Sequence, residues 1–168
     1  GPSLSIDNGA TIAINTGPAQ FTIRKSNFNI FDQIVVNGQT LVASGNSGKL
    51  IVRDSSGVEF SSANDTLSQA VIEENGPVRT IVKATGSFKN ASGVRLLDYT
   101  ARLYFYKGKS YVKGDYTLRN ASKNFMSDVK FSNVEAVVPL AIGANKKVEF
   151  ALKSTTTGPR DLAPGQTA

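Results

Sequence analysis

Apolar and polar residues alternate over short stretches of the chain, and clusters of Gly, Asn, Asp and Ser separate these stretches. The stretches are rich in Val, Ile, Thr, Tyr and Phe, which favours β-strands over helices. No helical period with caps at both ends is found. The pattern predicts an all-β domain, with strands expected at residues 11–14, 21–24, 30–36, 40–43, 50–53, 58–61, 67–73, 78–88, 95–106, 111–120, 129–139 and 147–152.

Turn residues between these stretches predict hairpins. Asn37 and Gly38 lie between two apolar runs, and both tolerate the positive φ that a type I′ turn requires. Residues 55–57 and 90–93 predict two further hairpin loops. Strands at this spacing form an antiparallel β-sandwich or a barrel-like domain, here of about ten to twelve strands. The sequence does not distinguish between the sandwich and the barrel.

The most regular hairpin is expected at residues 95–120, where apolar residues occupy every second position of the first arm. A two-residue turn would place Arg102 opposite Lys113, a contact between like charges. Opposite charges across two strands stabilise a sheet by about 0.2–1 kcal/mol per pair, and like charges destabilise it. We therefore predict a four-residue loop at 107–110 and a charged surface on one sheet face, with the opposed pairs Arg102–Asp115 and Asp98–Arg119.

The last fifteen residues, STTTGPRDLAPGQTA, differ in composition from the rest of the chain. Three consecutive Thr, two Pro and two Gly are typical of a linker or a frayed end. We predict an all-β domain over residues 1–153 and a linker-like tail over 154–168; the alternative is an ordered strap along the domain. Gly1-Pro2 matches a protease remnant (a hypothesis that an intact mass would test). No apolar run is long enough to predict a membrane span.

The amino-acid composition limits the kinds of catalytic and metal site that the chain can contain. The chain has 168 residues, 19 Lys plus Arg against 13 Asp plus Glu, and neither His nor Cys. These absences exclude a Ser-His-Asp triad, a Cys-His dyad, a zinc finger and thiol redox chemistry. The acidic turns near Asp54 and Glu73 lack the spacing of a calcium-binding loop. We therefore predict no catalytic residue, no metal site and no cofactor, and expect that the domain is not an enzyme.

The candidate ligand-binding residues lie near the loop end of the predicted hairpin. Tyr and Arg together can bind a sugar or an anion, and they also serve lyase chemistry on uronic acids. The plainer interpretation is a solvated sheet face whose charges pair across strands. Without Trp, only Tyr and Phe can stack on a sugar ring. The five candidates are Tyr104, Tyr106, Tyr111, Arg102 and Lys113.

The net charge of +6 raises the question of nucleic-acid binding. Seven basic residues and two acids fall between Arg102 and Lys130. No helix-turn-helix, RNP-like motif or Gly-rich phosphate loop accompanies them, so we predict no nucleic-acid partner. A basic surface fits an acidic polysaccharide or a bacterial envelope equally well.

One family resembles the chain over roughly half its length. Residues 76–120 contain a GPVR start to a long strand, a YTARLYFY strand and a YVK return strand that ends in Asn. This pattern resembles the N-terminal β domain, a RIFT-related barrel, of bacterial and fungal exo-rhamnogalacturonan lyase-like proteins. Residues 28–42 and 48–62 resemble the earlier hairpins of that domain. The resemblance implies an accessory domain beside a helical toroid that carries the polysaccharide chemistry, and no catalytic residue of the family maps onto this chain.

We therefore predict a non-catalytic accessory β domain of a larger bacterial, polysaccharide-active protein. The domain would support or present its neighbour in the same polypeptide, in the extracellular space or the cell envelope. One alternative is a carbohydrate-binding module, with an acidic polysaccharide as ligand. The other is a structural or adhesive surface-protein domain that assembles through a sheet edge.

Overall fold

The structure, a computed structural model, describes residues 1–120, 128–143, 147–150 and 158–161. The first of its sheets contains five consecutive strands, each antiparallel to the next. They are β1 (Ser5–Asp7), β2 (Thr11–Asn15), β3 (Ala19–Arg24), β4 (Gln33–Val36) and β5 (Gln39–Val42).

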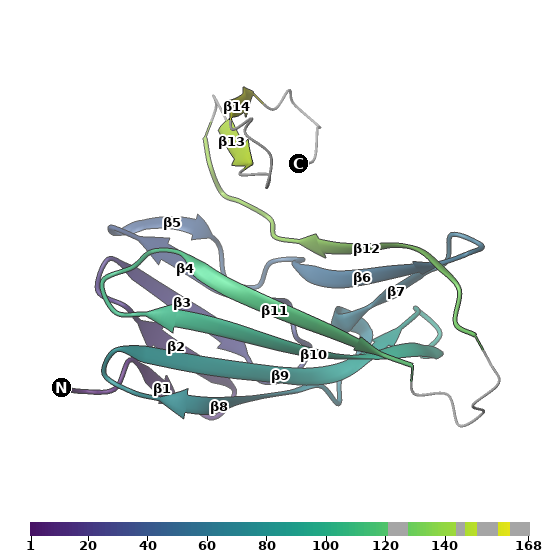
Figure 1. The fold of residues 1–168 in the computed structure, drawn as a ribbon, viewed down its shortest axis with the longest axis horizontal. Coiled ribbons are helices and arrows are strands. Elements are labelled where there is room, and N and C mark those ends of the chain that lie inside the picture. Colours follow the sequence, from purple (N-terminus) through teal and green to yellow (C-terminus); the bar gives the residue numbers. More distant parts are fainter. Residues whose placement is uncertain (121–127, 144–146, 151–157, 162–168) are drawn as a thin grey trace.

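A second, larger sheet lies against the first (Figure 1). Its strands are β6 (Lys49–Asp54), β7 (Glu59–Ser61), β8 (Gln69–Asn75), β9 (Arg79–Lys89), β10 (Arg95–Tyr106), β11 (Val112–Arg119) and β12 (Phe131–Val137). The order is β11-β10-β9-β7-β6-β12, and β8 also pairs with β9. A 3-10 turn, η1 (Ser62–Asn64), joins β7 to the segment before β8. Two further strands, β13 (Lys147–Phe150) and β14 (Gly158–Asp161), pair with each other.

The core lies between the two sheets, because alternate residues of each strand point inward. Leu103 and Phe105 of β10 are fully buried, and the Phe105 ring lies 5.0 Å from the ring of Phe21 in β3. The ring of Phe28 stacks on Tyr99 at 5.9 Å. The all-β prediction is therefore confirmed, and the architecture is a sandwich rather than a barrel. Among the described residues, no helix is long and apolar enough to cross a membrane.

The predicted hairpin register is confirmed. Phe105 faces Val112, so the loop spans residues 107–110, and Arg102 faces Asp115 while Asp98 faces Arg119. The predicted turn at residues 37 and 38 also forms, with φ of 49° at Asn37 and 80° at Gly38.

Three features differ from the sequence pattern or add to it. The sequence pattern does not predict β1, because in this strand the polar residue faces inward and the apolar one outward: Ser5 is buried and Ile6 is 65% exposed. The Ser5 hydroxyl donates to Asn75 Oδ1 at 2.8 Å, which satisfies the buried polar group. β4 begins at Gln33 rather than at Ile30, because Ile30 has a φ of 69° and leaves the extended conformation. β14 falls within residues 154–168, and the domain boundary at residue 153 stays a prediction.

Candidate binding groove on the outer face of the second sheet

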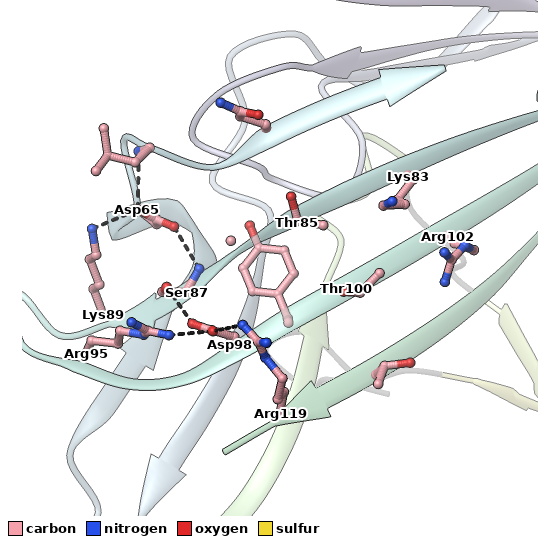
Figure 2. A pocket seen from close by; sticks show the side chains of 15 residues that line it. Asp65, Lys83, Thr85, Ser87, Lys89, Arg95, Asp98, Thr100, Arg102 and Arg119 are labelled. Carbon is pink, nitrogen blue, oxygen red and sulfur yellow. Dashed lines mark hydrogen bonds and ion pairs between the residues drawn. The ribbon is translucent and has the colours of Figure 1, made fainter. Parts of the chain in front are cut away.

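An open groove of about 700 Å³ crosses β8, β9, β10 and β11 on the face that points away from the core (Figure 2). Five of its lining residues are cationic, two are acidic, and most of the others carry a hydroxyl or an amide. The cations are Lys83, Lys89, Arg95, Arg102 and Arg119, and the acids are Asp65 and Asp98.

Cross-strand pairing arranges the groove residues in three rows. The central row, here called the threonine row, contains Gln69, Thr85, Thr100 and Thr117. The Asp98 row, on one side, contains Ser87, Asp98 and Arg119. The Arg102 row, on the other side, contains Lys83, Arg102 and Asp115, of which Asp115 does not line the groove. Adjacent rows are two residues apart along each strand, so the two charged rows lie about 13 Å apart.

Asp98 organises one end of the groove. Its carboxylate accepts hydrogen bonds from the Ser87 hydroxyl at 2.8 Å, from Arg119 Nη2 at 2.7 Å and from Arg95. Figure 2 shows Asp98 between the two arginines. Burial alone would raise the pKa of Asp98, but the hydrogen bonds from Arg119, Ser87 and Arg95 outweigh it and hold the pKa below its usual value. One buried carboxylate therefore fixes two guanidinium groups, which leaves a local positive charge.

Asp65 fixes the wall of the groove beside β9. It follows η1, in the gap between β7 and β8, and its Oδ2 accepts a hydrogen bond from the backbone N of Ser87 at 2.7 Å. Its Oδ1 pairs with Lys89 Nζ at 2.8 Å. Burial alone would raise the pKa of Asp65, but the hydrogen bonds from Lys89, Ser87 and Leu67 have the larger effect. The pKa of Asp65 is therefore below its usual value. The Asp65 carboxylate thus accepts the backbone hydrogen bond that Ser87 of β9 would otherwise donate to a neighbouring strand.

Gly86 allows two buried side chains to approach β9 closely. A Cβ at this position would lie 2.5 Å from Tyr99 Oη and 2.9 Å from Asp65 Oδ2. Burial raises the pKa of Tyr99, and the nearby Ser68 hydroxyl lowers it by a smaller amount. The Tyr99 hydroxyl has no hydrogen-bond partner among the described residues. Only glycine leaves room for this arrangement.

The Arg102 row draws its counter-charge from β8. Arg102 Nε and Nη2 donate to the two carboxylate oxygens of Glu73 at 2.7 and 3.0 Å, and Lys83 Nζ lies 3.6 Å from Glu73. Glu73 is the extra residue of a β-bulge, because Ile72 and Glu74 face consecutive residues of β9. Asp115 lies opposite Arg102 as predicted, but its carboxylate contacts Lys113 at 3.2 Å.

The four other candidates from the sequence lie on the same sheet face, beyond the Arg102 row. Lys113 Nζ is 4.8 Å from the centre of the Tyr104 ring, a cation–π contact. The rings of Tyr106 and Tyr111 lie 5.9 Å apart. Of the five candidates only Arg102 lines the groove, and their role in ligand binding stays a prediction.

Catalytic and metal chemistry find little support in the described part of the chain. No group of three or more His, Cys, Asp or Glu residues there is placed to hold a metal ion. The acids of the groove have lowered pKa values, whereas a general acid at neutral pH needs a raised one. Asp65 and Asp98 are therefore not suited to act as general acids at neutral pH, and the five cations suit the groove to an anion.

A comparison with known families agrees with this architecture. Residues 5–154 match the model of the family described as "PcRGLX-like protein central beta sandwich domain". No curated protein matches the chain. The resemblance to a β domain of rhamnogalacturonan lyase-like proteins is confirmed, and the family model describes a central sandwich where the resemblance implied an N-terminal, barrel-type domain. The chain belongs to the family of PcRGLX-like central β-sandwich domains.

Proposed function

We propose that this domain is a non-catalytic supporting domain of a larger polysaccharide-active protein and that it packs against a neighbouring domain of the same polypeptide. The family supports this proposal, because its description places the sandwich centrally in a longer protein. The absence of His and Cys from the chain and the lowered pKa values of the groove acids support the non-catalytic part.

The observation that carries the proposal is the exposure of apolar side chains on the inner faces of the two edge strands. Tyr116 of β11 faces Ala101, and Val134 of β12 faces Val52. Both partners are fully buried, whereas Tyr116 is 43% exposed and Val134 is 48% exposed. The larger sheet thus extends beyond the cover that the five-stranded sheet provides.

A second, partly apolar surface lies near the ends of the same edge strands. A pocket of about 600 Å³ there is lined by four apolar residues, Leu97, Leu118, Val129 and Phe131, and by Asn120, Asp128 and Lys130. Phe131 is 47% exposed. Contiguous exposed apolar surface on a soluble domain commonly marks a site of contact with another protein surface. These inner faces therefore offer a site for a neighbouring domain.

The test compares the isolated domain with the full-length parent protein. We expect Tyr116→Ser and Val134→Ser to change the melting temperature of the isolated domain little, because both side chains are half exposed there. In the full-length protein each substitution should lower the melting temperature and weaken protection of the neighbouring domain against protease, because buried apolar contacts are lost.

Val71→Ser is the matched control, because Val71 is 46% exposed and faces Lys83 on the outer side of the sheet. This substitution should change the melting temperature by the same small amount in the isolated domain and in the full-length protein. If Val134→Ser also has the same small effect in both, no neighbour packs on these inner faces.

We also propose that the parent protein acts in the extracellular space or the cell envelope of a bacterium. The support is the family's link to polysaccharide-active proteins, whose polymeric substrates lie outside the cytoplasm. Fractionation of cells that express the natural protein tests this location: recovery from the cytoplasm alone would contradict it.

A further inference from the structure

The groove carries more positive than negative charge, although its charges are paired. Its five cations are shared among only three acids: Asp65 with Lys89, Asp98 with two arginines, and Glu73 with Lys83 and Arg102. Asp98 and Glu73 each serve two cations, so one surplus positive charge lies beside each of them. An anion that enters the groove therefore meets uncompensated charge at two defined places, of which the one at Asp98 carries two guanidinium groups.

The two arginines that contact Asp98 are held in place and remain accessible. The side chains of Arg95 and Arg119 are 47% and 74% exposed, although both contact the buried Asp98. A guanidinium group has five N–H donors in a planar fork, so it can bind Asp98 and still offer a parallel pair of donors to a second carboxylate. Because Asp98 already orients both groups, a ligand would lose little entropy in ordering them.

The threonine row sets the chemistry of the rest of the ligand. Thr85, Thr100 and Thr117 stand side by side on three adjacent strands, and Gln69 extends the row onto β8. Hydroxyls and an amide both donate and accept, which suits a chain of hydroxyl groups better than a purely apolar or purely anionic surface. The charged rows on either side form the borders of a trough about 13 Å wide.

A single-stranded nucleic acid fits this surface less well. Such ligands need exposed aromatic rings on which bases stack, and the one aromatic residue that lines the groove, Tyr99, is 2% exposed. We propose that the groove binds a carboxylate-bearing oligosaccharide, with its sugar rings along the threonine row and a carboxylate on Arg95 and Arg119. This site lies on the outer face of the sheet and is independent of the docking proposed for the inner faces of β11 and β12.

Titration calorimetry on the chain of 168 residues tests the site. The probes are a six-residue oligomer of a uronic acid and the methyl ester of the same oligomer, which has the same hydroxyls and no charge. We expect the acid to bind and the ester to bind at least about tenfold more weakly. Arg95→Gln and Arg119→Gln should each weaken binding of the acid by about tenfold, and thermal melts should show that both variants fold.

Two further variants separate a sugar site from a merely basic surface. Thr100→Val retains every charge but removes a hydroxyl from the centre of the row, and it should weaken binding of the acid several-fold. Arg79→Gln is the matched control: Arg79 lies on the same strand as Lys83, is paired with Glu74 and does not line the groove, so its substitution should leave binding unchanged within about twofold.

Three results would overturn the proposal. The first is equal binding of the acid and its ester. The second is equal binding of a DNA oligonucleotide and the uronic-acid oligomer, or no effect of Thr100→Val, because either would show a general attraction for polyanions. The third is loss of binding in Tyr104→Ala together with unchanged binding in Arg119→Gln, because that would place the ligand on the tyrosines beyond the groove.

Discussion

Gly86 shows how a single residue without a side chain permits the wall of the groove to form. A Cβ there would collide with Tyr99 Oη and Asp65 Oδ2, at 2.5 and 2.9 Å. Both neighbours are 2% exposed and therefore have little freedom to move. We expect Gly86→Ala to lower the free energy of unfolding by about 1–3 kcal/mol, measured by urea denaturation.

Gly143→Ala is the control, because a Cβ at that position meets nothing within 4 Å. Its effect should stay within about 0.5 kcal/mol. A Gly86→Ala variant as stable as the original chain would show that Tyr99 and Asp65 do not close over β9 in solution.

The hydrophobicity of a residue predicts correctly whether it is buried only where its contacts with neighbouring strands follow the usual arrangement, with apolar residues inside and polar residues outside. The alternation of β10 placed Leu103 and Phe105 in the core, and both are fully buried. The same reasoning fails at Ser5 and Ile6, where the polar residue is inside and the apolar one outside. The reason is a long-range contact, because Asn75 supplies the hydrogen bond that makes burial of Ser5 tolerable.

At the scale of elements, β10 separates the core from the groove by alternation alone. Leu103 is 1% exposed, whereas the preceding Arg102 lies in the groove and is held by Glu73. We expect Leu103→Ala to lower the free energy of unfolding by about 2–5 kcal/mol through the cavity that it leaves. Arg102→Ala should lower it far less, because a partly exposed ion pair contributes little.

Denaturation in low and high salt adds a second criterion to this comparison. The small effect of Arg102→Ala should shrink further in high salt, since it is electrostatic, and the effect of Leu103→Ala should not. Similar losses for the two variants would mean that β10 does not alternate between an inner and an outer face.

The hairpin of β10 and β11 was predictable because its information is local. Charges on its two arms decide between two registers, and the structure has the predicted one. The groove was only partly predictable, because β8 and β9 contribute to it from elsewhere in the chain. Lys83 and Glu73 meet Arg102 through the bulge in β8 and the pairing of β8 with β9, which no short-range pattern reveals.

For the whole molecule, the choice between sandwich and barrel depended on how the two halves of the strand sequence separate. Strands β1–β5 form one sheet and β6–β12 the other, so the chain passes between layers once, at residues 43–48, and neither sheet closes on itself. Strand patterns alone do not contain this information, because each strand has the same alternation in either architecture.

Below about pH 9, the stability of the whole molecule should depend on pH only at the acidic end. Asp32, Asp65 and Asp98 are buried, and burial alone would raise the pKa of each; hydrogen bonds from their partners more than offset this and lower the pKa below the usual 3.8. The unfolded chain then binds protons more readily than the folded one. The stability that these groups contribute is complete above the unfolded pKa and is lost as the pH falls through the folded values.

We therefore expect a nearly constant free energy of unfolding between about pH 5.5 and 9, because the chain has no histidine to titrate there, and a decrease below about pH 4. Urea denaturation at a series of pH values measures both regions. Asp98→Asn should cost about 1–3 kcal/mol at neutral pH, since it removes a charged acceptor of three hydrogen bonds, and should make the acid decrease shallower. A transition between about pH 6 and 8, or an acid decrease equally steep in Asp98→Asn, would contradict this, because the buried carboxylates would then not be the groups that link folding to protons.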